Sequence, residues 1–290
     1  MTANTAAPAA DPAGGTTGAR PRPTVSWARQ TIRLTRSEFT LFVRYKTAWM
    51  FLGLPLFLAF VTLQLPNHEV IPGFGNAELA MIASIGTISL ILGIGHPSNV
   101  FTARRESLVL KRFRVSGVPQ TAIFGAVIGI VVLFSLLIAA LVVGMVFAAP
   151  ARVLPRDPLM LVLAVVLSGV MYSLMGLLVT PLVRNAESAQ MAAMVPMMVL
   201  LFTSGGVIPL EVLPETARQV MSFVPSVPAS EMAQAAYTGY DAFGGFADAE
   251  ERSYLGLWTA ALPSIGVMLA WIGVLALLVR RYFRWDPRQP

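Results

Sequence analysis

The sequence has little charge and few of the side chains on which most active sites depend. Of its 290 residues only 12% are charged, none is cysteine, two are histidine, and Lys46 and Lys111 are the only lysines. Soluble domains carry about 25% charged residues, so this chain cannot cover an ordinary water-facing surface. The lack of cysteine excludes a disulfide framework and any zinc or redox site built on thiolates. The composition therefore favours an integral membrane protein.

Motifs for catalysis and for ATP binding are missing as well. No G-x-S-x-G occurs, and His68 is not followed by the second histidine of a zincin. A P-loop needs Gly-Lys-[Ser/Thr], but neither lysine follows a glycine. The chain is therefore not predicted to be an enzyme, and any ATP that drives it must be hydrolysed by another chain.

Six long apolar runs without Asp, Glu, Lys or Arg predict an all-α, polytopic protein with six transmembrane helices. A helix needs about 20 apolar residues to cross a hydrocarbon core of about 30 Å, and a charge at mid-membrane costs at least about 2.5–3.5 kcal/mol. The third run is the longest, so we expect its helix to tilt or to extend past the lipid. The predicted spans are approximately 47–67, 79–101, 119–149, 159–183, 188–210 and 257–280.

Ion-driven transport has little support in these runs. A carrier coupled to protons or Na⁺ normally needs ionisable ligands within the bilayer, and His96 is the only such residue in the six runs. A Na⁺ site made of carbonyl and hydroxyl oxygens stays open. We interpret His96 as a local hydrogen-bonding residue, with a minor role in a transport pathway as the alternative.

The basic residues predict the orientation in the membrane. Six spans put both termini on one side, and that side would hold 17 of the 21 Lys and Arg, because only Arg152, Arg156, Arg218 and Arg252 fall on the other. Cytoplasmic segments carry the excess of Lys and Arg, so both termini are predicted to be cytoplasmic. The pI of about 10.2 is then a topology signal, and no nucleic acid partner is implied.

Two segments precede the first span. Residues 1–24 are rich in Ala, Pro, Gly and Thr without an apolar h-region, which indicates a disordered cytoplasmic tail and not a signal peptide. Residues 27–46 place arginines, among them Arg33 and Arg36, opposite an apolar face, which predicts an amphipathic helix in the headgroup plane. Together with the basic loop that follows, this helix is predicted to contact a cytosolic partner, with lipid anchoring without a partner as the alternative.

The loop at 101–118 is short and basic. Read as a helix, it gathers Val109, Leu110 and Phe113 on one side, and its basic residues lie on the other before Gly117 and Pro119 end it. Such a segment fits a rigid lever pressed against another protein. The alternative, that its arginines only fix the topology, leaves the apolar triplet unexplained.

The region 212–240 is predicted to lie outside. Prolines bracket two helix-like pieces that are far too short to cross a membrane. They fit a re-entrant pair, which is allowed only where protein or water covers the backbone.

The order of these features resembles the membrane subunit, or permease, of type-2 ABC exporters. The resemblance rests on the amphipathic helix, on the loop ARRESLVLKRFRVSGVP at 103–119, and on FTSGGVIPLEVLPETARQVMSFVPSVPASEMAQAAYTG at 202–239. The loop is similar to a family pattern E-x-x-x-L-K-R-x-x-x-x-G-x-P. The resemblance identifies 25–284 as a type-2 transmembrane domain, of the drug-efflux-like kind, in a bacterial plasma membrane.

The resemblance implies a half-transporter. Two permease subunits would pair as a homodimer or heterodimer, and each would bind a separate cytosolic ABC ATPase that holds ATP and Mg²⁺, so no cofactor is expected in this chain. In the family the first cytoplasmic loop is a coupling helix seated in a groove of the ATPase. Carried over, the ATPase contacts are Arg104, Arg105, Glu106, Leu110, Lys111 and Arg112, with Arg33 and Arg36 as a secondary interface. The outer gate would comprise Gly205, Gly206, Pro209, Glu211 and Pro214.

The cargo and the general class of function each keep an alternative. Fourteen Met and 16 Phe, with uncharged spans, favour a hydrophobic or amphiphilic cargo such as a drug, antibiotic or lipid-like compound, while packing against lipid explains the same residues. Spans one, two and five would line the path. The alternative function is a non-transporting six-helix assembly protein that recruits a cytosolic partner. A neighbouring gene for a P-loop ATPase would favour the transporter.

Overall fold

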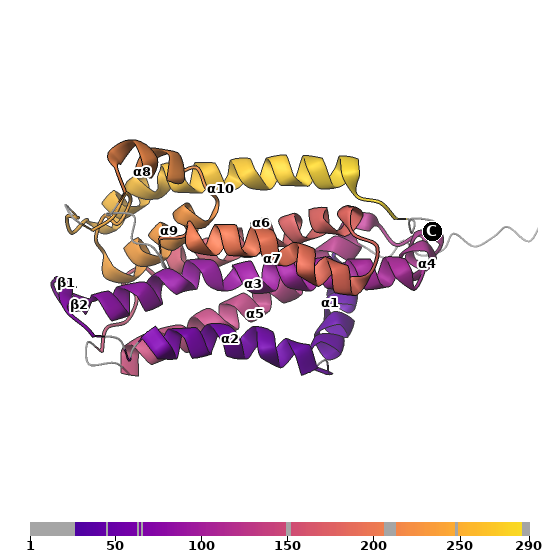
Figure 1. Ribbon diagram of the computed structural model, residues 1–290, viewed down its shortest axis with the longest axis horizontal. Helices are drawn as coiled ribbons and strands as arrows, with labels where there is room; N and C mark the ends of the chain where they lie inside the picture. The colour runs from indigo at the N-terminus through magenta and orange to yellow at the C-terminus, as the bar shows by residue number, and fades with distance from the viewer. Residues whose placement is uncertain are drawn as a thin grey trace, which may run out of the picture.

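The computed structural model describes residues 27–44, 46–62, 64, 66–148, 152–205, 213–246 and 249–285. Over these ranges the protein is a bundle of helices with one small hairpin (Figure 1), so the all-α class is confirmed. The helices are α1 (Trp27–Arg44), α2 (Lys46–Thr62), α3 (Asn76–Glu106), α4 (Val109–Val115), α5 (Gln120–Ala148), α6 (Pro158–Val179), the 3-10 helix η1 (Thr180–Leu182), α7 (Ala186–Phe202), α8 (Glu215–Met221), α9 (Ser226–Thr238) and α10 (Tyr254–Tyr282). The antiparallel strands are β1 (Glu69–Ile71) and β2 (Phe74–Gly75).

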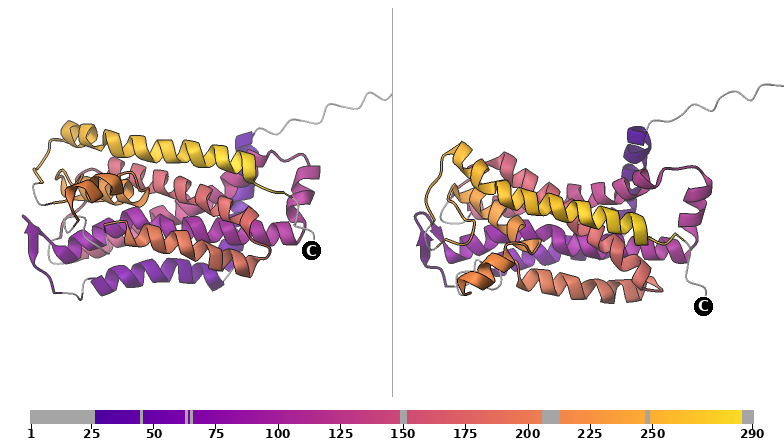
Figure 2. Two further views of the ribbon diagram at one scale, coloured as in Figure 1. Left: turned by 45° about the horizontal axis from the view of Figure 1, so that its top comes forward. Right: turned by 90° about the horizontal axis from the view of Figure 1, so that it is seen from above.

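Four helices within the described residues are long and apolar enough to cross a membrane. They are α3, α5, α6 with η1, and α10. α2 and α7 run beside them (Figures 1 and 2), but each has 17 residues, and at 1.5 Å per residue each is about 25 Å long. The chain is thus a multi-pass membrane protein.

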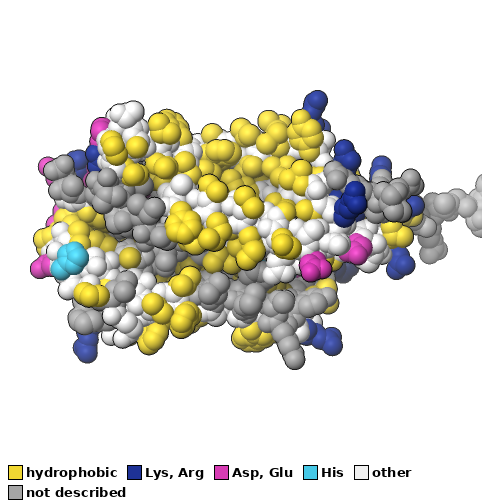
Figure 3. Space-filling view, viewed as in Figure 1, with side chains coloured by type: hydrophobic (Ala, Val, Ile, Leu, Met, Phe, Trp, Pro, Cys, Tyr) yellow, Lys and Arg dark blue, Asp and Glu magenta, His cyan; other side chains and the backbone are white. Residues whose placement is uncertain are grey.

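Charged side chains among the described residues concentrate at the two ends of the molecule. On the face in Figure 3, basic and acidic side chains gather at the two ends, and hydrophobic side chains cover the middle. The described ends differ in structure: the hairpin, α8 and α9 lie at one, which we call the hairpin end, and α4 lies at the other, the α4 end (Figure 1). An apolar belt between two charged ends is the surface that a bilayer requires.

Helix α3 forms the centre of the bundle. It is the most buried of the four long helices, and α10 is the least buried. Glycines allow α3 and α6 to cross closely: a Cβ on Gly176 would lie 2.6 Å from the carbonyl oxygen of Ile94, and one on Gly93 would lie 2.7 Å from Cβ of Tyr172. Small residues at such crossings are typical of membrane helix pairs. In lipid the hydrophobic effect does not drive helices together, so close dispersion contacts between the backbones stabilise the pair instead.

Helix α1 lies across the bundle and not along it (Figure 2). It ends at Arg44, two residues before the predicted end at 46, and α2 begins at Lys46. Its side chains divide into an inner set, with Glu38 and Phe42 buried, and an outer set, with Arg33 and Arg36 exposed. This arrangement suits a helix at the membrane surface.

The two short helices at the hairpin end differ in burial. Most of α9 is buried, between α3, α6 and α10, whereas α8 has no buried residue. The bundle end is therefore closed by α9, and α8 lies on its surface.

Candidate functional site

The loop predicted at 101–118 is a sharp helix–turn–helix at the α4 end. α3 continues through it as far as Glu106, Ser107 caps that helix, and Leu108 has a φ of 59°. A left-handed leucine is uncommon, and here it reverses the chain into α4. Gly117, with a φ of 75°, ends the segment before α5, where only glycine takes such a conformation without strain.

The seven-residue helix α4 is fixed to the bundle by apolar side chains, chiefly Leu110. Leu110 is 0% exposed, and Val109 and Phe113 beside it are half-buried. Lys111 and Arg112 face away and are exposed, as is Glu106 before the turn. Leu110 therefore seats α4 against the bundle, and its predicted contact with an ATPase stays a prediction.

Arg105 is the second buried residue of the predicted contact set. It is 1% exposed, and its guanidinium donates through Nη1 to the carbonyl oxygen of Thr180 at 2.7 Å and through Nη2 to that of Val183 at 2.5 Å. These carbonyls close the end of α6 and η1, where backbone oxygens lack helical partners and the helix dipole is negative. Arg105 therefore ties α3 to the end of α6 and η1 within the bundle.

Arg104 ties α3 to α1 instead. Its Nη2 donates to both carboxylate oxygens of Glu38, at 2.5 and 2.6 Å, and the side chains of the pair are only 15% and 7% exposed. Its guanidinium carbon also lies 6.0 Å from the centre of the Phe101 ring, within the range of a cation–π contact.

Aromatic side chains complete the seat of α1. The Phe42 ring lies 4.4 Å from that of Phe134 on α5 and meets the imidazole of His96 on α3 edge-on at 4.8 Å. Phe39 stacks on Phe134 at 5.6 Å. α1 is thus held by packing as well as by charge, and its movement must be passed to α3 and α5.

The segment after α10 also folds back onto this end of the molecule. Phe283 packs against Phe124 at 4.9 Å and Phe101 at 5.8 Å, and Trp285 packs against Phe124 at 5.5 Å and Phe283 at 5.1 Å. We call these four residues the aromatic cluster. It joins the last helix to the end of α3 and the start of α5, where α4 is inserted.

Residues 60–281 match the family model described as "ABC-2 family transporter protein". The chain belongs to the ABC-2 transporter family. Comparison with curated proteins gives no match. The resemblance to type-2 ABC permeases is confirmed, and the chain is the membrane component of an ABC transporter, of a family without an ATPase of its own.

In this ABC-2 permease the predicted contact residues fall into three groups. Glu106 at the end of α3 and Lys111 and Arg112 on α4 are exposed, Arg104 is mostly buried in an ion pair, and Arg105 and Leu110 are internal. Arg33 and Arg36 are exposed on α1.

Sequence reasoning missed three parts of this site. Glu38 was findable, because it is the only acidic residue between 27 and 46. The carbonyl acceptors at Thr180 and Val183 leave no mark in a sequence. The pair Phe283 and Trp285 reads as an ordinary aromatic end of a span.

At the hairpin end the permease's predicted gate is only partly described. Gly205 has a φ of 79°, and Pro214 caps α8; Gly206, Pro209 and Glu211 lie outside the described residues. Nearby, on α9 and outside the spans, Glu231 is buried and accepts a bond from the Gly244 amide at 3.0 Å. Burial raises the pKa of Glu231 to about 7, with Asp241 adding to the shift and the Gly244 bond opposing it.

Proposed function

We propose that this chain is the permease half of an ATP-driven exporter, and that each of its two permease subunits binds one separate ABC ATPase on α4 and the turn before it. The observation that carries the proposal is the construction of α4. It is a short helix seated by a fully buried Leu110, and Lys111 and Arg112 are exposed on it. Glu106 is exposed at the end of α3, just before the turn. A rigid, charged helix that projects from a membrane bundle can bind in a groove on the surface of a cytosolic ATPase.

The ties behind α4 support a coupling role. Arg105 joins the end of α3 to α6, and the Arg104–Glu38 pair joins it to α1. Packed, hydrogen-bonded elements move as units and switch between discrete arrangements. A push on α4 would therefore shift three helices together.

The proposed topology has six crossings, with α2 and α7 as the additional two and both termini in the cytoplasm of a bacterial cell. Their lengths of about 25 Å match a slightly thinned bilayer. The α4 end would then be cytoplasmic, in line with the positive-inside distribution. α8 and α9 would form the outer re-entrant pair, with Gly205 and Pro214 at the exit.

The proposed cargo is hydrophobic or amphiphilic. One face of α7 exposes Met191, Met194 and Met198 in a stripe with Val195 and Phe202. Methionine surfaces adapt to varied apolar shapes. A second permease subunit, identical or different, would close this face into a path.

The test is reconstitution with a separate ABC ATPase, sought among the products of the neighbouring genes. The double variant K111E/R112E reverses two exposed charges on α4, and R184Q, exposed near η1, is the matched control. We expect the double variant to lose complex formation and cargo-stimulated ATP hydrolysis, and R184Q to keep both. Unchanged stimulated hydrolysis in K111E/R112E would overturn docking on α4. A stable complex that cargo never stimulates would favour the assembly-protein function instead.

A further inference from the structure

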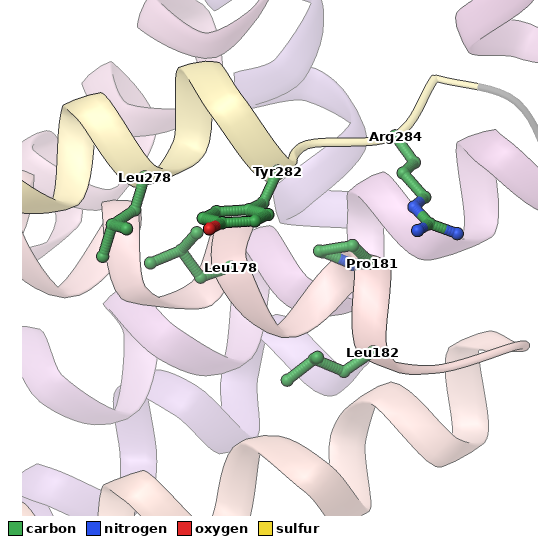
Figure 4. Close-up of a pocket in the computed structure, with 6 residues that line it drawn as sticks. All are labelled: Leu178, Pro181, Leu182, Leu278, Tyr282 and Arg284. Carbon is green, nitrogen blue, oxygen red and sulfur yellow. The ribbon is translucent and has the colours of Figure 1, made fainter.

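An apolar groove opens between the ends of α6 and α10 (Figure 4). It encloses about 240 Å³. One wall comes from α6 and η1, and the other comes from the last turns of α10 and the residues after it. The lining residues are Leu178, Pro181, Leu182, Leu278, Tyr282 and Arg284.

The groove has one charged lining residue. Arg284 is exposed and forms no ion pair with an acidic side chain in the part of the chain that the structure describes. Arg280 and Arg281 are exposed in the last turn of α10, and the guanidinium of Arg281 lies 5.8 Å from the centre of the Tyr282 ring. An apolar trough therefore ends at a concentration of positive charge.

Both walls of the groove are fixed by contacts already described. The chain leaves α10 in an extended conformation at Phe283, and successive side chains of an extended segment point to opposite sides. Phe283 packs in the aromatic cluster, and Tyr282 and Arg284 line the groove. On the other wall, Arg105 holds the carbonyl of Thr180 next to Pro181. The groove is thus preformed and does not need a ligand to open it.

The position of the groove along the bundle and its exposure indicate which class of ligand can bind there. It lies where two of the long apolar helices end, and Leu182 in its lining is 70% exposed, so the groove opens to the outer surface of the bundle and not to its interior. Molecules at that depth combine an acyl chain with a headgroup. Basic pockets between membrane helices favour anionic headgroups, and the exposed guanidiniums give this groove that charge.

We propose that this groove binds an anionic phospholipid, with an acyl chain along the leucines and the headgroup phosphate on Arg284. The lipid would belong to the cytoplasmic leaflet, a point that rests on the proposed topology. Binding itself requires only that α6 and α10 cross the bilayer.

The test is photocrosslinking of the full chain in vesicles of equimolar phosphatidylcholine and phosphatidylglycerol. p-Benzoylphenylalanine replaces Leu182, which is 70% exposed at the groove, or Leu137, which is 49% exposed on α5 and serves as the control position. The readout is the ratio of phosphatidylglycerol to phosphatidylcholine adducts by mass spectrometry. We expect a ratio well above one at position 182 and near one at position 137.

Substitution of the arginine decides the headgroup contact. One basic residue near an anionic surface contributes an attraction that corresponds to about a fivefold preference, so R284Q should lower the ratio at position 182 about fivefold, R284K should keep most of it, and R184Q should leave it unchanged. Equal ratios at both positions, no effect of R284Q, or adducts only to protein would each overturn the proposal. No ATPase is present in these vesicles, so either result leaves the exporter proposal to its own test.

Discussion

Arg105 and Val183 are joined across the α4 end by a hydrogen bond of 2.5 Å from a guanidinium to a backbone carbonyl. The two residues lie 78 positions apart in the chain. With the second bond to Thr180, one buried side chain holds the end of α3 against the end of α6. The helix that leads into α4 therefore cannot move without moving α6.

Removal of this tie should destabilise the whole protein. R105Q leaves two buried carbonyls without their charged donor, and hydrogen bonds to charged groups contribute about 1.5–3 kcal/mol each. We expect the midpoint of thermal unfolding, measured on the purified chain in detergent, to fall by several degrees. R105K keeps the positive charge but loses the two-pronged donor geometry of the guanidinium, so its unfolding midpoint should lie between those of R105Q and the unmodified chain. R184Q, an exposed arginine in the same region, should unfold as the unmodified chain does, and an R105Q midpoint equal to that of R184Q would contradict the structural role.

The pair of Glu38 and Arg104 should be coupled in a double-mutant cycle. Both side chains are mostly buried, so either single variant, E38Q or R104Q, leaves an uncompensated charge at a cost of about 2 kcal/mol or more. In the variant with both changes no charge remains, and the loss should be clearly smaller than the sum of the two. The measurement is the unfolding free energy in denaturant, with R29Q on the same helix as the control. Additive losses would show that α1 is held by its aromatic contacts alone.

The long spans follow from the sequence because exclusion of charge is a property of composition that needs no knowledge of the fold. The end of α4 is equally local, since Gly117 supplies a positive φ at that position. The orientation of a single side chain is different. Arg104 and Arg105 are adjacent and chemically identical, yet one pairs with a carboxylate on α1 and the other with carbonyls on η1.

Their difference arises from the rotation of about 100° between neighbouring residues of a helix, combined with the elements that surround α3. Periodicity along one segment cannot contain that information, because it depends on where α1 and α6 pack. For the same reason the burial of Leu110 against the bundle cannot be derived from the sequence of its own segment. The exposed Lys111 and Arg112 needed no such knowledge.

The aromatic cluster should contribute to both stability and coupling. F283A removes the ring that touches Phe101, Phe124 and Trp285, and a buried Phe-to-Ala change costs about 3–5 kcal/mol. Because Phe283 is half-buried, we expect about half of that loss in unfolding free energy. F147A, a 47% exposed phenylalanine on α5, is the matched control and should cost far less. In a complex with the ATPase, the F283A variant should also weaken the stimulation of ATP hydrolysis by cargo. If F283A left both stability and stimulation unchanged, the segment after α10 would only rest on α3.

Glu231 should make stability depend on pH. Its pKa is raised by burial from 4.5 to about 7, so the folded state holds the proton more tightly than the unfolded state does. The resulting stabilisation is complete below pH 4.5, declines as the pH rises through about 7, and is absent above that. At about 1.4 kcal/mol per pKa unit, the change amounts to roughly 3 kcal/mol. Thermal unfolding of the full chain in detergent between mildly acidic and mildly basic pH measures it.

The variant E231Q carries a neutral side chain that can still accept the bond from the Gly244 amide. It should unfold at a higher temperature than the unmodified chain at basic pH, match it at acidic pH, and show a flatter dependence between them. E250Q removes an exposed carboxylate near Asp241 and controls for the loss of a negative charge at this end. If E231Q kept the full pH dependence, the buried carboxyl would not be its source, and if E250Q alone flattened the curve, surface charge repulsion would account for it.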